Sequence, residues 1–152
     1  MSDPRLSVRK TYKLYLGGKV PRTESGRSYL VSEAKGRPWA NACRASRKDV
    51  RDAVVAALEM VERTAQAGLP PAHVGLHAGP VVFQDGDYFG RTVNLAARIA
   101  GHAQAGQVLV SDQVVAECGD GTVAFEPIGP VPLKGVADPV PLHRATRQAP
   151  GG

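Results

Sequence analysis

One stretch, residues 73–98, limits the possible folds of this chain more than any other. It reads HVGLHAGPVVFQDGDYFGRTVNLAAR. Apolar and β-branched residues over 74–83 predict an extended segment, which Gly79-Pro80 makes irregular. A polar turn covers residues 84–87, and a helix is predicted to begin through Gly90 and the two residues after it. The stretch therefore predicts a strand, an acidic turn and a helix in direct succession.

The predicted helix carries two side chains suited to an anion. Asn94 and Arg98 are four residues apart, so both leave from one helical face. Arginine offers a rigid fork of donors that matches phosphate, and asparagine adds one donor group and one acceptor. Without the surrounding motif, the spacing favours a plain helix-surface pair. Together with the acidic turn, it favours an anion site.

At these residues the chain resembles a known family. The run D-Y-F-G-x-x-V-N-x-x-x-R, preceded by H-x-G-x-V, resembles the C-terminal half of a class III adenylate/guanylate cyclase catalytic domain. The resemblance continues through GQVLVSDQVV to PIGPVPLKGVADPVPLHRA and covers about residues 57–147. It implies an α+β fold, part of a ferredoxin-like palm. The implied activity is conversion of a nucleoside triphosphate to a cyclic nucleotide, with ATP or another nucleoside triphosphate as substrate.

The resemblance also implies roles for four residues. Asp87 matches the position that contacts the purine edge, where an acidic residue accompanies adenine. Asn94 and Arg98 match the residues that orient the ribose and stabilise the transition state. Lys134, in the sequence Leu-Lys-Gly, matches the lysine that reaches the terminal phosphates. Without the resemblance, Asp87 is an ordinary turn former, and a lysine in a glycine turn such as Lys134 is solvated about as often as it binds phosphate.

The first third of the chain has a different resemblance. The segments KTYKLYLGGKVPRTESGRSYLV and ANACRASRKDVRDAVVAA, within about residues 8–57, resemble the extreme N-terminus of an aldehyde dehydrogenase. We predict a β-hairpin over 12–20 and a long amphipathic helix over 47–67, with Ser46 as its cap and Asp49 three positions on. The predicted organisation is a dehydrogenase-like leader (1–56), a half-cyclase domain (57–147) and a disordered tail (148–152).

The metal-binding half of the cyclase site is absent from this prediction. The family binds Mg²⁺ or Mn²⁺ with two aspartates from its N-terminal half, which the dehydrogenase-like leader replaces. Asp3 lies in the predicted disordered lead, and Asp49 and Asp52 lie in the predicted helix. His73 and His77 share a strand face, but no suitable third ligand lies nearby. We therefore predict no metal ligands and no cyclase turnover by this chain alone.

Charge and composition limit the partners. Residues 1–58 carry 13 Lys and Arg against 5 Asp and Glu, a balance of +8, while residues 59–152 carry 6 against 9, a balance of −3. The basic residues are scattered, which favours a solvated surface over nucleic-acid binding. No apolar run approaches 18 residues, so no membrane span is predicted. Two cysteines, without a disulfide framework, favour the reducing cytoplasm.

Several functional hypotheses remain open. The first is a truncated cyclase-like domain that forms a homodimer or a heterodimer with another cyclase domain. The second is a non-catalytic module that dimerises with an intact cyclase and tunes its activity. The third is a dehydrogenase-related fragment, against which the missing cofactor motif argues. The fourth is a recombined fragment without function.

Overall fold

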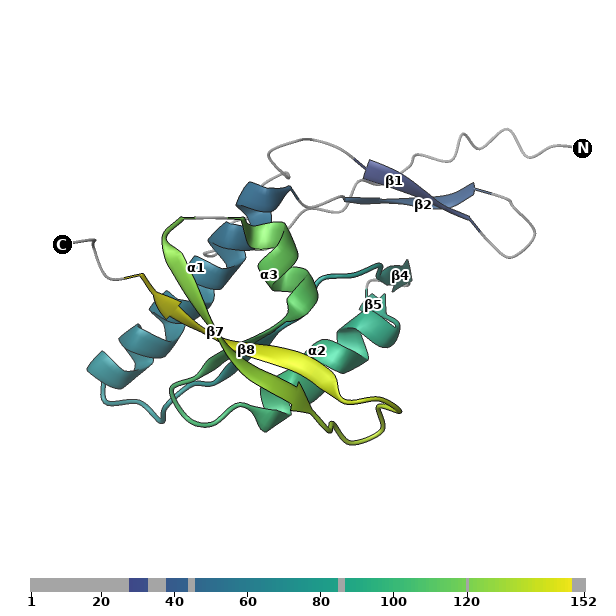
Figure 1. The fold of residues 1–152 in the computed structure, drawn as a ribbon. Coiled ribbons are helices and arrows are strands. Elements are labelled where there is room, and N and C mark those ends of the chain that lie inside the picture. The colour runs from purple at the N-terminus through teal and green to yellow at the C-terminus, as the bar shows by residue number, and fades with distance from the viewer. Residues whose placement is uncertain (1–27, 33–37, 44–45, 85–86, 120, 149–152) are drawn as a thin grey trace, which may run out of the picture.

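A computed structural model describes residues 28–32, 38–43, 46–84, 87–119 and 121–148. Strands and helices alternate along most of the chain (Figure 1). In chain order they are β1 (Ser28–Ser32), β2 (Pro38–Cys43), α1 (Arg47–Gln66), β3 (Val74–Leu76), β4 (Val82–Gln84), β5 (Asp87–Phe89), α2 (Arg91–His102), β6 (Val108–Ser111), α3 (Asp112–Cys118), β7 (Val123–Val131) and β8 (Val140–Arg147). This is the mixed α+β class that the sequence predicts.

A four-stranded sheet forms the centre, in the order β3-β6-β8-β7. β3 and β6 are parallel, whereas β6–β8 and β7–β8 are antiparallel. All four residues of β6 are buried, because both faces of this strand are covered. Two further antiparallel pairs, β1–β2 and β4–β5, lie outside the sheet.

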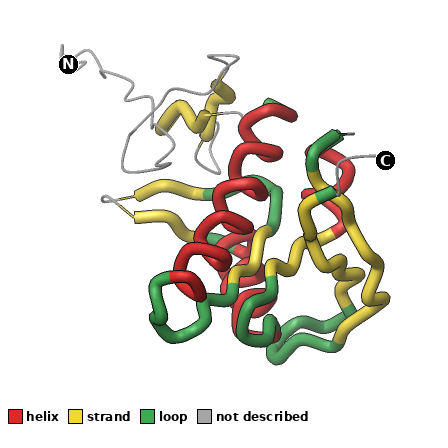
Figure 2. Tube along the Cα trace, turned by 90° about the vertical axis from the view of Figure 1, so that its left-hand side faces the viewer, coloured by secondary structure: helices red, strands yellow, loops and turns green. Residues whose placement is uncertain are grey.

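Helices cover both faces of this sheet (Figures 1 and 2). One buried cluster joins α1 and α3 to the first face and includes Val54, Leu58, Val108, Val110 and Val114. The other joins α2 to the opposite face and includes Ile99, Leu109, Val131, Leu133 and Leu142. The alternation of neighbouring residues along β6 between the two clusters follows from the period of two in a strand.

The long helix α1 begins where the sequence predicts. Ser46 is the N-cap, and its Oγ accepts a hydrogen bond of 3.2 Å from the backbone N–H of Asp49. In return, a carboxylate oxygen of Asp49 accepts from the backbone N–H of Ser46 at 2.7 Å. This reciprocal pair is a capping box, which satisfies donors that the first turn leaves without helical partners.

The two edges of the sheet differ. β7 carries Pro127 and Pro130, and its pairing with β8 shifts register between Pro127 and Gly129. A proline lacks the N–H that an added strand would need, and a bulge disturbs the ladder further. The opposite edge, β3, consists of Val74, Gly75 and Leu76 and has neither device.

Most predicted boundaries are confirmed within a few residues, and the differences have local causes. The extended segment predicted over 74–83 is divided into β3 and β4 around Gly79-Pro80, as the proline implies. α2 continues to His102, beyond the loop start predicted at residue 101. The hairpin predicted over 12–20 and the frayed residues 149–152 lie outside the described residues. Within the described part, none of the helices combines the length and apolar character needed to cross a membrane.

Candidate functional site

Helix α2 rests on β3 through an unusually close backbone contact. A Cβ atom added to Gly75 would lie only 2.2 Å from the backbone nitrogen of Ala100. Glycine is therefore required here, because any side chain would push the helix away from the sheet. His73 reinforces the contact, with its Nδ1 2.8 Å from the carbonyl oxygen of Ala100. The helix that carries Asn94 and Arg98 is thereby fixed against the sheet.

The start of α2 is fixed by a second contact. The hydroxyl of Thr92, which is buried, donates a 2.6 Å hydrogen bond to the carbonyl oxygen of Pro80. A Cβ on Gly79 would meet this same hydroxyl at 2.7 Å. Gly90, just before the helix, has a φ of 124°, a conformation that favours glycine. The glycines in this part of the motif thus serve close packing and a sharp helix entry.

Asn94 and Arg98 both lie exposed on α2. The residues that follow each of them, Leu95 and Ile99, pack into the cluster beneath the helix. This packing orients the helix so that the predicted pair points away from the sheet. Among the described residues, Arg98 forms no ion pair. The pair is available to a ligand.

Lys134 is attached to the same cluster. Its neighbour Leu133 is buried with Ile99, and Val136 packs against the cluster from the side. The N–H of Val136 donates to the carbonyl of Leu133 at 3.1 Å, and Gly135 has a φ of 76°, which closes a tight turn around the lysine. Lys134 itself is exposed. The fold thus brings Lys134 to the α2 side, although 36 residues separate it from Arg98 in the sequence.

Asp87 is the first residue of β5, in register with Gln84 of β4. β5 ends at Phe89, and α2 begins two residues later. The backbone of Asp87 therefore lies close to the start of α2 (Figure 1). Its role at the purine edge stays a prediction.

His77 occupies the α2 side of β3, as His73 and Gly75 do. A 2.8 Å hydrogen bond joins its Nδ1 to the Oγ of Ser111, which is fully buried. Burial lowers the pKa of His77 below its ordinary value of 6.5, because desolvation disfavours the charged imidazolium. A serine directly before a helix commonly caps it with its side chain, and Ser111 directly precedes α3. It stands at the N-cap position, but its hydroxyl bonds His77 instead.

His143 is largely covered. Its side chain is only 18% exposed, and its Nε2 contacts a carboxylate oxygen of Asp112. β8 carries His143 opposite Val110 of β6, beside the start of α3. The contact spans 31 residues, which explains why no local pattern indicated it.

The described residues do not fit a metal centre. They contain no group of three or more His, Cys, Asp or Glu side chains that could hold an ion together. Several carboxylates are already engaged by cations, as with Asp52 and Lys48, Glu126 and Arg144, and Glu62 and Arg147. The resemblance to the cyclase family implies Mg²⁺ or Mn²⁺, for which the described residues offer no such group.

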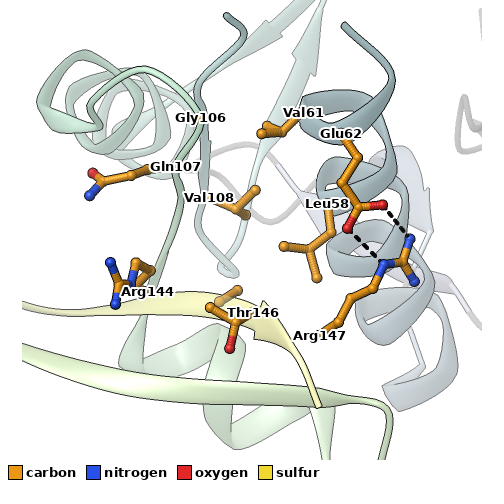
Figure 3. A pocket seen from close by; sticks show the side chains of 10 residues that line it. Leu58, Val61, Glu62, Gly106, Gln107, Val108, Arg144, Thr146 and Arg147 are labelled. Carbon is orange, nitrogen blue, oxygen red and sulfur yellow. Dashed lines mark hydrogen bonds and ion pairs between the residues drawn. The ribbon is translucent and has the colours of Figure 1, made fainter. Parts of the chain in front are cut away.

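One hollow of 280 Å³ lies on the other side of the sheet, between α1 and the ends of β6 and β8 (Figure 3). Apolar side chains, including Leu58 and Val61, line it. Glu62 and Arg147 close its rim through two hydrogen bonds of 2.8 and 3.1 Å. None of the four predicted site residues contributes to it. Arg144 and Arg147 each already face a glutamate, so the hollow has no unbalanced charge to attract an anion.

Arg91 was not singled out from the sequence. It lies three residues before Asn94 and seven before Arg98, so all three share one helical face. The spacing was readable in the sequence, but the motif drew attention to the pair alone. Exposure of Arg91 at the first position of α2 adds it to the candidate site.

Comparison with known proteins places these features in a family. The family model of the adenylate and guanylate cyclase catalytic domain matches residues 24–144. A pH-sensitive adenylate cyclase from Mycobacterium tuberculosis is 36% identical over 109 residues, which cover 66% of this chain and 27% of the relative. A receptor-type adenylate cyclase from Trypanosoma congolense is 48% identical over 63 residues, covering 38% of this chain and 8% of the relative. The chain thus spans about a quarter or less of these relatives.

Solved structures agree on the fold. The adenylyl cyclase CyaB from P. aeruginosa superposes with a TM-score of 0.59 at 21% identity, covering 72% of this chain and 64% of that one. The catalytic core of a rhodopsin-guanylyl cyclase with converted specificity, in complex with ATPαS, gives 0.59 at 24% identity, covering 80% and 72%.

The family match begins at residue 24 and so includes part of the segment predicted as a leader. The dehydrogenase-like origin of that leader is not shown by these comparisons and stays a prediction. From Glu24 to Arg144, which is well over half of its length, the chain matches one family model, and it therefore belongs to the adenylate and guanylate cyclase catalytic domain family.

Proposed function

We propose that this chain supplies the purine-side and transition-state half of a nucleotidyl cyclase site and acts on ATP or another nucleoside triphosphate. The observation that carries the proposal is the exposed pair Asn94 and Arg98 on α2, with the Lys134 turn packed on the same cluster. An asparagine, a guanidinium and an ammonium that converge on one helix are the groups that a polyphosphate ester requires.

The order of residues suggests how the substrate lies. Asp87 precedes the start of α2, Asn94 and Arg98 follow along the helix, and Leu133 shares a buried cluster with Ile99 near the helix end. The purine would lie at the start of α2, the ribose and α-phosphate near Asn94 and Arg98, and the terminal phosphates near Lys134. The substrate would thus extend along the helix.

Each residue has a chemical task in this arrangement. The ribose 3′ hydroxyl loses its proton and attacks the α-phosphorus, a new P–O bond forms, and the bond to the β-phosphate oxygen breaks to release pyrophosphate. Asn94 would hold the ribose by hydrogen bonds. Arg98 would stabilise the negative charge on the pentavalent phosphorus, and Lys134 the charge on the leaving pyrophosphate. The carboxylate of Asp87 would accept a hydrogen bond from the adenine amino group.

Divalent metals would have to come with a partner chain. The described residues do not fit a metal centre, so we derive no step through a metal from this chain. We propose that the chain alone does not turn over and that it completes a site in a heterodimer whose other member carries metal-binding aspartates; a homodimer would lack them in both copies. A cytoplasmic location belongs to the same proposal, because that compartment supplies nucleoside triphosphates.

A complementation assay tests the proposal. The purified chain is mixed with a cyclase that keeps both metal-binding aspartates but carries alanine at the position equivalent to Arg98. Cyclic AMP formation from ATP with Mn²⁺ is then measured in the mixture and for each protein alone. We expect product only in the mixture, and none when this chain carries Arg98→Ala. Product from the chain alone would overturn the assignment of missing metal ligands.

The non-catalytic module is the second candidate, favoured because the described residues contain no group of His, Cys, Asp or Glu side chains that could hold a metal ion. It predicts that the chain associates with an intact cyclase domain and changes the activity of that domain, yet restores none to the arginine-deficient partner. A recombined fragment with a dehydrogenase-like leader predicts neither effect. Analytical ultracentrifugation of the mixture, run beside the complementation assay, separates the three.

A further inference from the structure

Helix α2 presents a stripe of three exposed polar side chains. Arg91, Asn94 and Arg98 follow one another at intervals of three and four residues, which places them on one face. The two arginines are separated by about 10 Å along the helix axis, at 1.5 Å per residue. The stripe therefore extends the Asn94–Arg98 pair by one turn toward β5.

Helix stability does not explain Arg91. A cation in the first turn opposes the positive end of the helix dipole, and α2 has no acidic residue in that turn to offset it. Within the described part of the chain, Arg91 forms no ion pair. The first turn of α1 also carries cations, Arg47 and Lys48, but Asp49 lies in the same turn and offsets them, and the last turn carries Arg63.

The position of Arg91 identifies the part of the ligand it would meet. Leu133, next to Lys134, belongs to the buried cluster that also contains Ile99 and Ala103 from the C-terminal end of α2, so under the proposed function the terminal phosphates would lie toward that end. Arg91 is at the opposite end, between Asp87 on β5 and Asn94. That is the end of the site where the nucleoside, rather than the polyphosphate, would lie.

We propose that Arg91 is a specificity residue that contacts the base, donating from its guanidinium to the acceptor edge of a purine. N7 is an acceptor in adenine and guanine alike, and guanine adds O6, which matches the arginine fork. Pyrimidines have no N7. This inference rests on the proposed function, since it requires a nucleoside triphosphate along α2.

Isothermal titration calorimetry on the full 152-residue chain tests it, with ATP, GTP, CTP and inorganic tripolyphosphate as probes. We expect Arg91→Gln to weaken the binding of ATP and of GTP about tenfold. The binding of CTP and of tripolyphosphate should not change. Arg98→Gln should weaken all four. Arg63→Gln on α1 is the matched control, because Arg63 is also an exposed helical arginine, 4.0 Å from Glu59, and should change none.

The outcomes separate the two claims. Suppose that wild type binds ATP, that Arg98→Gln weakens this binding and that Arg91→Gln does not. The base contact is then overturned and the proposed function stands. Equal losses for tripolyphosphate and ATP in Arg91→Gln would also overturn it, since the residue would then act on phosphate. If wild type binds none of the four probes, a base contact made by this chain on its own is overturned, while the complementation assay still decides the proposed function.

Discussion

The two helices that cover opposite faces of the central sheet treat their charges differently. On α1, Lys48 pairs with Asp52 at 3.3 Å, and Glu62 forms a two-bonded pair with Arg147 of β8. On α2, Arg91 and Arg98 are exposed without an ion pair among the described residues. Within the described part of the chain, the ion pairs of α1 include one that reaches the sheet, whereas the two arginines of α2, which the proposals above assign to a nucleotide, form none.

The contrast extends to how each helix is attached. α1 is held by a broad apolar cluster and by a capping box at its start. α2 has no side-chain cap, and its position depends on glycine contacts with β3 and on the Thr92 hydrogen bond. Substitutions on the two faces of the sheet should therefore affect stability and activity differently.

The largest effect is expected where α2 meets the sheet. Gly75→Ala places a methyl group within 2.2 Å of the Ala100 backbone, and backbone cannot move aside as a flexible side chain can. We expect a loss of about 3 kcal/mol or more in the free energy of unfolding, measured by urea denaturation. Gly101→Ala on the same helix meets open space and should be neutral or stabilising by up to about 1 kcal/mol. A stable Gly75→Ala protein would contradict the close contact.

The second-largest effect is expected from a substitution at Arg98, which should change activity and not stability. Arg98→Ala should reduce product formation in the complementation mixture by about 100-fold or more, because one donor to the transition state is lost. Its stability should stay within about 0.5 kcal/mol of wild type, since the side chain is exposed. Circular dichroism melting provides that check. A large stability loss with partial activity would show that Arg98 supports the fold.

A smaller effect is expected at the start of α1. Ser46→Ala removes the acceptor for the Asp49 N–H and should cost about 1 kcal/mol of unfolding free energy. Ser46→Asn, which keeps a capping oxygen, should recover most of it. Neither change should alter complementation once both chains are folded at the assay temperature. Loss of activity at full stability would mean that α1 also serves the site.

The smallest effect concerns the pair that joins α1 to β8. The hydrogen bonds from Arg147, and then its charge, lower the pKa of Glu62 below its ordinary value of 4.5. The pair therefore stabilises the folded state above that pH, and the contribution is lost as the pH falls through the lower folded-state pKa. Arg147→Gln should lower the melting temperature slightly at pH 7 and not in acid or at about 1 M salt. An equal decrease under all conditions would point to packing instead.

Local sequence patterns predicted the helices and strands. The features that they did not predict are contacts between residues far apart in the sequence. The α1 cap follows from Ser46 and Asp49, and the break in the strand from Pro80, because both signals lie within a few residues. The partners of His77 and His143 are 34 and 31 residues away, so sequence spacing could not reveal them. Lys134 reaches the α2 side only because Leu133 joins the same buried cluster.

In the candidate site, too, local spacing predicted some residues and not others. Asn94 and Arg98 were predictable as a pair because four residues place them on one face. Arg91 shares that face, but it gains meaning only once the fold shows which end of α2 lies near Lys134. The assignments of all four predicted residues to substrate groups remain predictions for the binding and complementation experiments.

The unequal edges of the sheet limit how copies of this chain could assemble. An added strand would find donors along β3, whereas β7 opposes pairing with Pro127, Pro130 and a shifted register. Two copies joined through β3 would present only proline-bearing edges to solution. Edge-to-edge association would therefore stop at a closed, twofold-symmetric dimer. Addition of further copies through this sheet, which would build an open-ended fibre, would be blocked at the β7 edges.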